Sequence, residues 1–223
     1  LELDYKKNKN KKIEIDLDII YEDSDIIIID KLPGILTHCS SNNNSLSIVD
    51  ILKKKNKILY QSEDPLRDGV VHRLDKDTSG LIIFVKNTKS YNGLKNSFSK
   101  REVHKIYNAI CWGKPLPIAG TINRPLSHFL NKKKVTLIKK GKDAITEYRV
   151  LNSFKNMFSK IECKIITGRT HQIRAHMLSM GCPLLGDKLY AKGRNIPKNI
   201  SKDIILLINK KKIQELTATK ITS

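Results

Sequence analysis

Two short segments of this chain gather the side chains that could do chemistry. The first, residues 72–80, has the sequence His-Arg-Leu-Asp-Lys-Asp-Thr-Ser-Gly and places carboxylates among cations beside an apolar run. The second, residues 168–176, has the sequence Gly-Arg-Thr-His-Gln-Ile-Arg-Ala-His and holds two arginines and two histidines. Solvated charges rarely cluster in this way beside buried sequence. The pattern indicates a catalytic anion that guanidinium groups hold, in a site that also meets a polyanion.

Asp75 is the predicted catalytic carboxylate. A carboxylate that attacks a carbon or removes a proton must stay ionised while it is shielded from water, and a nearby guanidinium favours the charged form. Arg174 lies at the edge of an apolar helical stripe, where it needs an anion, so we expect it to pair with Asp75. Arg73 shares a face with Asp75 if the segment is extended, although the start of a loop blurs this relation. The alternative is that the Asp75–Arg174 pair only braces two elements.

The other polar residues of the two segments have simpler interpretations. His171 and His176 are five positions apart, so they do not share a helical face well, and they indicate polar packing or phosphate contact rather than a metal site. Thr78 and Ser79 could act as nucleophiles, but before Gly80 they are more typical of a turn whose hydroxyls and amides satisfy the loop.

The segments that must position these groups are strands and helices without a regular βαβ repeat. Apolar alternation and β-branched runs predict strands at residues 13–19, 26–29, 70–71, 81–85, 103–112, 144–151, 158–167 and 215–222. Helices are predicted at residues 45–55, 88–99, 170–181 and 203–210. Thr170 is the expected N-cap of the third helix, and Gly181 is expected to end it. The order predicts an α+β fold. Tyr107, in the strand at 103–112, is either a core residue or a platform for a stacked base.

The charge of the chain indicates a nucleic-acid partner. Its 223 residues suffice for one substantial core or two small lobes. They carry 42 basic and 22 acidic residues, a net charge of +20, which favours binding to phosphates. Only eight of the basic residues are arginine. The abundance of lysine, asparagine and isoleucine is also what AT-rich coding produces, so composition alone leaves both explanations open.

The remaining composition points to a soluble protein of the cytoplasm. The four cysteines are far apart and lack the spacing of a zinc site, which indicates small buried residues in a reducing compartment. No apolar run is long enough to span a membrane, and no signal peptide is visible. Because the chain begins with Leu1, we expect its natural start to lie upstream.

Together, these residues resemble the RluA-type family of RNA pseudouridine synthases. Residues 72–80 resemble the catalytic signature of that family, in which the aspartate is essential, and residues 168–176 with 181–187 resemble its second signature. Shorter likenesses occur at residues 21–23, 30–31, 105–109 and 142–146, so that the resemblance covers about residues 13 to 223. Around residues 120–134 and 190–199 the chain is most similar to the RluD branch, which modifies large-subunit ribosomal RNA.

The chain departs from the family pattern at several points. Pro33 stands one position later than usual, and Thr217 replaces a usual histidine. The chain also ends at Ser223, where the family continues, and lacks the RNA-binding domain that often precedes this one. We therefore expect residues 1–12 to be a basic linker or remnant of such a domain. Residues 13–223 would be the catalytic domain, truncated at its C-terminus.

The resemblance implies an α+β fold with a mixed, largely antiparallel central sheet, flanking helices and a basic active-site cleft. It implies isomerisation of uridine to pseudouridine in RNA, with ribosomal RNA as the first expected substrate and transfer RNA as the second. Asp75 would act as nucleophile or base, at the sugar or at the ring. Arg73 would occupy the space of the flipped base, Tyr107 would stack on the uracil and Arg174 would pair with Asp75. No metal or organic cofactor is implied, and a monomer is expected.

Two rival functions belong to other classes. A decayed enzyme could survive as a non-catalytic RNA-binding or ribosome-assembly protein that uses only its basic surface. A phosphotransferase is suggested by the His-Arg-x-Asp of kinase catalytic loops, but the chain has neither a glycine-rich phosphate loop nor Asp-Phe-Gly.

Overall fold

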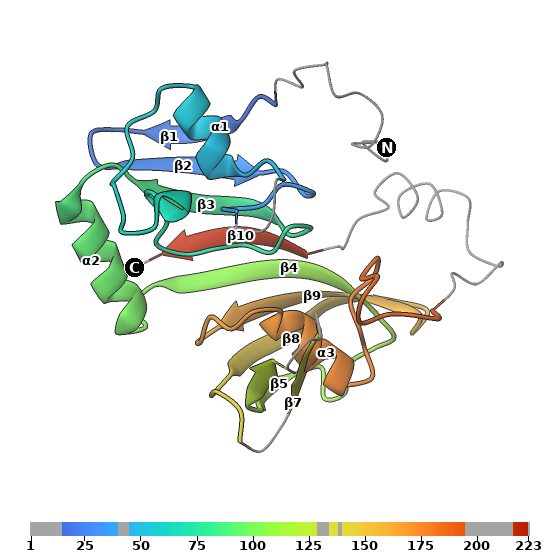
Figure 1. The fold of residues 1–223 in the computed structure, drawn as a ribbon. Helices are drawn as coiled ribbons and strands as arrows, with labels where there is room; N and C mark the ends of the chain where they lie inside the picture. The colour runs from blue at the N-terminus through green and yellow to red at the C-terminus, as the bar shows by residue number, and fades with distance from the viewer. Residues whose placement is uncertain (1–14, 40–44, 129–133, 138–139, 195–215, 223) are drawn as a thin grey trace.

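One large sheet runs through the described part of the chain (Figure 1). The computed structural model describes residues 15–39, 45–128, 134–137, 140–194 and 216–222. The predicted helix at 203–210 and the expected linker at 1–12 lie outside the described residues. Within the described part, no helix is long and apolar enough to cross a membrane.

The sheet has eight strands and is largely antiparallel. Its strands are β1 Asp18–Glu22, β2 Ile26–Lys31, β3 Ser79–Val85, β4 His104–Trp112, β5 Ala119–Asn123, β8 Ile145–Phe154, β9 Phe158–Ile165 and β10 Leu216–Thr222. They lie side by side in the order β1-β2-β3-β10-β4-β9-β8-β5. Every neighbouring pair is antiparallel except β3 and β10, which run parallel. The predicted α+β fold with a mixed, largely antiparallel sheet is confirmed.

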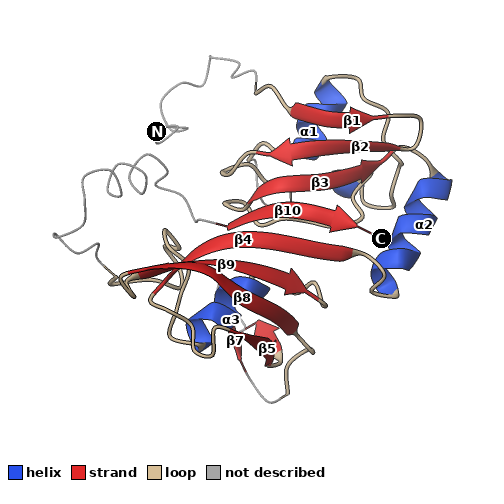
Figure 2. Cartoon of the chain, turned by 180° about the vertical axis from the view of Figure 1, so that it is seen from behind, coloured by secondary structure: helices blue, strands red, loops and turns tan. Residues whose placement is uncertain are grey.

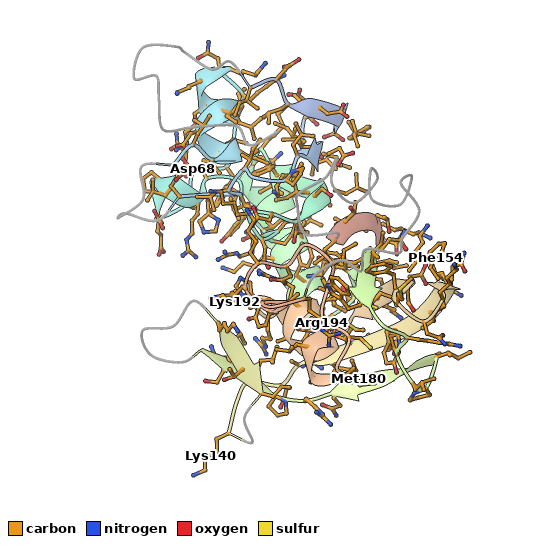
Figure 3. All side chains as sticks on the ribbon, turned by 90° about the vertical axis from the view of Figure 1, so that its right-hand side faces the viewer. Asp68, Lys140, Phe154, Met180, Lys192 and Arg194 are labelled. Carbon is orange, nitrogen blue, oxygen red and sulfur yellow. The ribbon has the colours of Figure 1, made fainter. Side chains whose placement is uncertain are left out.

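Three short strands were not expected from the sequence. They are β5 in the large sheet and the pair β6 (Leu126–His128) and β7 (Val135–Leu137), which forms a separate two-stranded sheet. Strands of three to five residues bury too few side chains to show a clear period. Lys140, close after β7, points away from the rest of the molecule (Figure 3).

The described helices lie on one face of the large sheet or at one end of its strands. They are α1 (Ile48–Lys54), α2 (Thr88–Ser99) and α3 (Gln172–Ser179), together with a short 3-10 turn at Pro65–Arg67. α1 and α3 lie in front of the sheet in Figure 1 and behind it in the opposite view of Figure 2, while α2 lies at one end of the strands. α1 and α3 bury apolar residues, whereas α2 buries none of its side chains fully.

The start of α3 differs from the prediction. The N-cap is His171, whose backbone is left-handed with φ of 55° and whose side chain makes no capping hydrogen bond, so the expectation for Thr170 was wrong. The end of the helix is as expected, with Gly181 at φ of 73° just beyond it.

The approach to residues 72–80 also differs from the prediction. Val70 makes only an isolated bridge to Phe84, and the regular strand begins within the last two residues of the segment, at Ser79. The predicted strand at 70–71 is therefore wrong, while the one at 81–85 is confirmed and extended. β3 is an interior strand whose residues 82–85 are buried, which explains its unbroken apolar run.

Gly80 allows β10 to pack beside β3. It pairs with Ala218, and its φ is 106°, in a region that side chains disfavour. A Cβ at this position would lie 2.2 Å from the backbone oxygen of Ala218 and 2.6 Å from its nitrogen. The last described strand can therefore lie beside the first signature only because this residue lacks a side chain.

We expect Gly80→Ala to lower the free energy of unfolding by at least about 2 kcal/mol, because backbone strain and a clash with β10 add together. The measurement is denaturant unfolding. Gly34→Ala is the matched control, since Gly34 has φ of 90° but nothing within 4 Å of the added Cβ, so that only the strain remains. Equal losses in the two variants would show that the approach of β10 does not depend on Gly80.

Candidate active site

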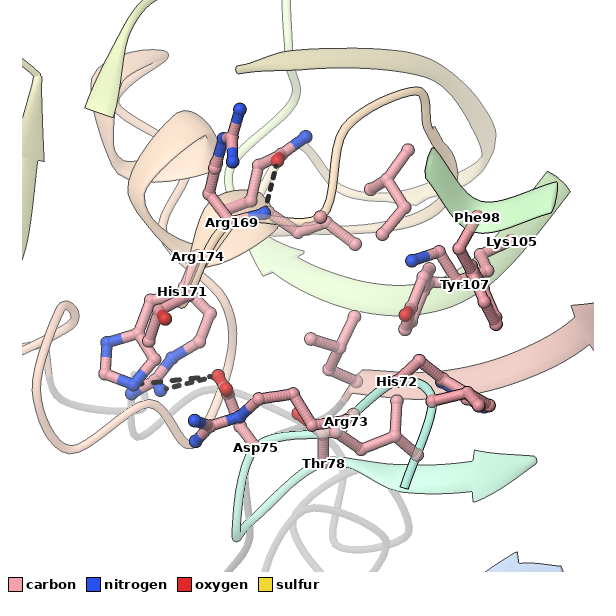
Figure 4. Close-up of a pocket in the computed structure, with 18 of the residues that line it drawn as sticks. His72, Arg73, Asp75, Thr78, Phe98, Lys105, Tyr107, Arg169, His171 and Arg174 are labelled. Carbon is pink, nitrogen blue, oxygen red and sulfur yellow. Dashed lines mark hydrogen bonds and ion pairs between the residues drawn. The ribbon is translucent and has the colours of Figure 1, made fainter. Parts of the chain in front are cut away.

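A pocket of about 420 Å³ brings the two signature segments together. It lies between the loop that precedes β3, the end of α2, the start of β4 and the start of α3. Its lining includes five basic side chains and one carboxylate, namely Arg73, Lys95, Lys105, Arg169, Arg174 and Asp75. Figure 4 shows Asp75, His171 and Arg174 gathered on one side and Phe98, Lys105 and Tyr107 on the other. All four residues that were predicted to form the site line this pocket.

The carboxylate of Asp75 is held by one oxygen. Arg174 Nη1 donates a hydrogen bond of 3.1 Å to Asp75 Oδ2, as predicted for this pair. The other oxygen, Oδ1, makes no hydrogen bond with any residue in the described part of the chain. The side chain of Asp75 is 17% exposed. It therefore presents one fixed and one unoccupied oxygen to whatever enters the pocket.

A second carboxylate, which the sequence did not reveal, fixes Arg174. Asp187 accepts hydrogen bonds of 2.7 Å from Nε and 3.0 Å from Nη2, and its side chain is fully buried. The guanidinium thus forms a two-bond fork with Asp187 and uses its remaining nitrogen for Asp75. Burial alone would lower the pKa of Arg174, but the two carboxylates outweigh this effect and raise the pKa above its usual value. Arg174 is a permanent cation here.

Tyr190 supports both Arg174 and His171. Its ring centroid lies 5.0 Å from the guanidinium carbon of Arg174, and its hydroxyl lies 3.1 Å from His171 Nδ1. The other ring nitrogen of His171, Nε2, lies 3.7 Å from Asp75 Oδ2. The left-handed backbone of His171 helps to aim the ring into the site, a common use of such strain.

The structure contains no metal centre in its described residues. No group of three or more histidine, cysteine, aspartate or glutamate side chains could hold an ion there. His176 is buried, and its ring nitrogens lie 2.9 Å from Thr146 Oγ1 and 3.0 Å from the carbonyl oxygen of Arg124. Its burial lowers its pKa. The interpretation of His176 as polar packing is confirmed.

The loop that carries Asp75 is held from two sides. Thr37 Oγ1 donates to the carbonyl of Leu74 at 3.1 Å and accepts from its amide at 3.2 Å. On the other side, Lys31 Nζ donates to the carbonyls of Leu32, Ile35 and Lys76 at 2.9, 2.9 and 3.0 Å. Burial lowers the pKa of Lys31 to about 8, against the opposite influence of Asp77 and Asp75. These contacts fix the backbone on both sides of Asp75.

The two hydroxyl residues after Asp75 differ in their contacts. The amide of Thr78 donates to the carbonyl of Asp75 at 3.1 Å, which closes the expected turn. Ser79 Oγ lies 2.7 Å from Thr217 Oγ1, so the threonine that departs from the family pattern joins β10 to this loop. The buried hydroxyl of Thr78 has no hydrogen bond in the described structure, and the hydroxyl of Ser79 bonds to β10. The expectation that these two hydroxyls satisfy the loop was therefore wrong.

Arg73 and Tyr107 occupy opposite environments. Arg73 is exposed and makes no hydrogen bond or ion pair with any residue that the structure describes. Tyr107 is 6% exposed, and its pKa is raised, first by burial and then by the charge of Asp75. Arg73 is therefore available to a ligand, while Tyr107 offers a rigid, uncharged ring.

Two supporting residues were missed for different reasons. Asp187 lies within the second signature segment, where a carboxylate in an apolar run is a signal that could have suggested a partner for Arg174. Lys31 stands at the end of an isoleucine-rich strand, where a lysine is ordinarily exposed to solvent. Nothing local indicates that its ammonium turns inward to three carbonyls.

Comparisons with known proteins show which family this chain resembles. The family model described as "RNA pseudouridylate synthase" matches residues 25–179. A "Ribosomal large subunit pseudouridine synthase D" from Buchnera aphidicola (subsp. Acyrthosiphon pisum) is 43% identical over 191 residues, which cover 84% of this chain and 58% of that protein. An "Uncharacterized RNA pseudouridine synthase" from Aquifex aeolicus is 37% identical over 193 residues, 85% of this chain and 61% of that protein. The chain thus spans about three fifths of the length of these relatives.

A solved structure shares the fold. "Human RNA Pseudouridylate Synthase Domain Containing 4" is 25% identical, with a TM-score of 0.69 over 92% of this chain and 83% of that one. The predicted resemblance to the RluA-type family, and within it to the RluD branch, is confirmed by these matches. The chain therefore belongs to the RNA pseudouridylate synthase family.

Proposed function

We propose that this chain isomerises uridine to pseudouridine in RNA, with Asp75 as the catalytic carboxylate. The observation that carries the proposal is the way in which the carboxylate of Asp75 is held. Arg174 holds one oxygen at 3.1 Å while the other has no partner among the described residues, inside a pocket that can receive a base. Such a group is oriented and largely shielded from water, as a nucleophile or base must be.

The reaction needs no redox partner. The bond between C1′ of the ribose and N1 of uracil breaks, the base turns, and C5 bonds to C1′, while C5 loses a proton and N1 gains one. Asp75 would act at the sugar or at the ring. The base must first leave its stack, at a cost on the order of a few kcal/mol. Arg73, exposed at the pocket, would fill the space it leaves, and the buried ring of Tyr107 would stack on it.

Large-subunit ribosomal RNA is the proposed substrate, with transfer RNA as the alternative. The support is the name of the Buchnera aphidicola relative and the charge of +20. We further propose that the protein acts as a monomer in the cytoplasm. The four cysteines are buried and free, as is usual in a reducing compartment. The paired and shielded Asp75 favours an active enzyme over a decayed RNA-binding protein.

Asp75→Asn is expected to reduce pseudouridine formation below about one thousandth of the original rate, because it removes the charge and nucleophilicity with little change of shape. RNA affinity should stay nearly the same. The measurement is single-turnover pseudouridine formation on uridine-containing ribosomal RNA. Asp77→Asn, an exposed neighbour on the same loop, is the control and should remain active. Substantial turnover by the Asp75 variant would refute the assignment.

Arg174→Ala and Arg73→Ala should fail in different ways. Loss of Arg174 leaves the fully buried Asp187 uncompensated, which should lower the free energy of unfolding by about 3–5 kcal/mol. Arg73 is exposed and unpaired in the described structure, so its variant should melt like the original protein but turn over slowly.

An RNA whose target uridine is already unpaired should partly rescue the Arg73 variant, because the cost of flipping is then smaller. Thermal melts and rates on paired and unpaired substrates make the comparison. Equal losses of stability in the two variants, without rescue, would contradict the role of Arg73.

RNA binding should weaken steeply with salt. Between about 50 and 200 mM salt, neutralisation of several phosphates predicts an increase of at least about 100-fold in Kd. Filter binding or fluorescence anisotropy at several salt concentrations measures it. A flat dependence would instead favour AT-rich coding as the origin of the basic composition.

A further inference from the structure

Lys105 lines the pocket, and the reaction steps proposed for Asp75, Arg73 and Tyr107 do not use it. It is two residues before Tyr107 on β4, so both side chains leave the strand on the same face. Both line the pocket, on the side away from Asp75 and Arg174 (Figure 4). A base that stacks on Tyr107 therefore has Lys105 as a neighbour.

The ammonium of Lys105 has no acidic partner among the residues that the structure describes. Its Nζ lies 5.2 Å from the centroid of the Phe98 ring, and a Cβ on Gly168 would approach it to 3.3 Å. Among the described residues it makes no hydrogen bond or ion pair, although the side chain is half-buried. Burial lowers its pKa. Its neighbour His72 adds no second positive charge, because burial, and then the charge of Lys105, lowers the pKa of His72 to about 3 and keeps it neutral.

An unpaired, half-buried cation lowers the stability of a protein unless a ligand supplies an anion or a hydrogen-bond acceptor for it. The substrate supplies a suitable group during the reaction. When the bond between C1′ and N1 breaks and an oxygen of Asp75 bonds to C1′, the electron pair stays on the uracil, spread over N1 and the two carbonyl oxygens. If Asp75 instead adds to C6 of the ring, the electron pair of the C5–C6 double bond moves to C5 and to the oxygen on C4. The base becomes an anion on either route.

We propose that Lys105 donates a hydrogen bond to a carbonyl oxygen of the target uracil and stabilises the negative charge that the base acquires. This inference rests on the proposed function. Later, C5 attacks C1′, the bond to Asp75 breaks, and the ring loses its C5 proton and regains one at N1, so the charge exists only between these steps. Lys95 and Arg169, which are exposed, are better placed than Lys105 for the phosphates of the backbone.

The first test is Lys105→Met, which keeps the length of the side chain and removes the charge. Loss of one preorganised donor should slow single-turnover isomerisation about 100-fold, with Kd for the RNA changed less than about twofold. Stability should not fall, because an unpaired cation is replaced by an apolar group. Lys105→Arg should recover part of the rate. Lys89→Met, an exposed charge on α2 outside the pocket, is the matched control and should behave like the original protein.

The second test changes the acceptor instead of the donor. RNAs with 2-thiouridine or 4-thiouridine at the target position replace one carbonyl oxygen by sulfur, a weaker hydrogen-bond acceptor. The original enzyme should lose more rate than Lys105→Met on one of these two RNAs, since the variant has no bond left to weaken. The RNA that shows this difference identifies the oxygen that Lys105 contacts.

The outcomes separate this inference from the proposed function. An original protein that makes no pseudouridine would refute the proposed function, and the role of Lys105 with it. An active original protein with an equally active Lys105→Met would refute only the inference. A Kd raised about tenfold with an unchanged rate would identify a phosphate contact and would also overturn it. If the Met variant does not fold, Lys105→Gln is measured against the same criteria.

Discussion

The forked guanidinium of Arg174 is the interaction on which the rest of the site depends. It joins a fully buried carboxylate, Asp187, to the reactive one, Asp75, from which Arg174 is 99 residues away in the sequence. Removal of Arg174 would leave the fully buried Asp187 without its cation in a region of low polarity. The planar fork also fixes direction, because two bonds to Asp187 leave one nitrogen pointing at Asp75. The position of the carboxylate is therefore set by an element that lies outside its own loop.

The sheet makes this pairing possible. β10 enters between β3 and β4, beside Gly80 at the end of the loop that carries Asp75, and Ser79 and Thr217 join their hydroxyls across the two strands. Lys31 and Thr37 hold the backbone of the same loop from the other side. The loop has little freedom, which is what a preorganised carboxylate requires.

The carboxylate of Asp75 and the ammonium of Lys105 lie on opposite sides of the pocket. Its one carboxylate lies beside Arg174 and His171 on one side, while Lys105 lies beside Phe98 and the neutral His72 on the other. Tyr107 stands next to Lys105 and extends an uncharged ring into the space between. A ribose on the first side would meet the carboxylate of Asp75 where the sugar reacts. A base stacked on the ring of Tyr107 would meet the ammonium of Lys105 where the base takes up negative charge.

The sequence by itself determined the fold class, the family and the pairing of Asp75 with Arg174. It also determined the longer strands β2, β3, β4, β8, β9 and β10. These follow from periods within one segment, or from signatures in which each residue has a fixed neighbour. Only the tertiary structure decided that Asp187 anchors Arg174, that Lys31 turns inward and that His171 begins α3. It also decided that Lys105 meets no anion in the described part of the chain. Such facts depend on which groups meet across distant segments and on how much water remains between them, and no local pattern records either.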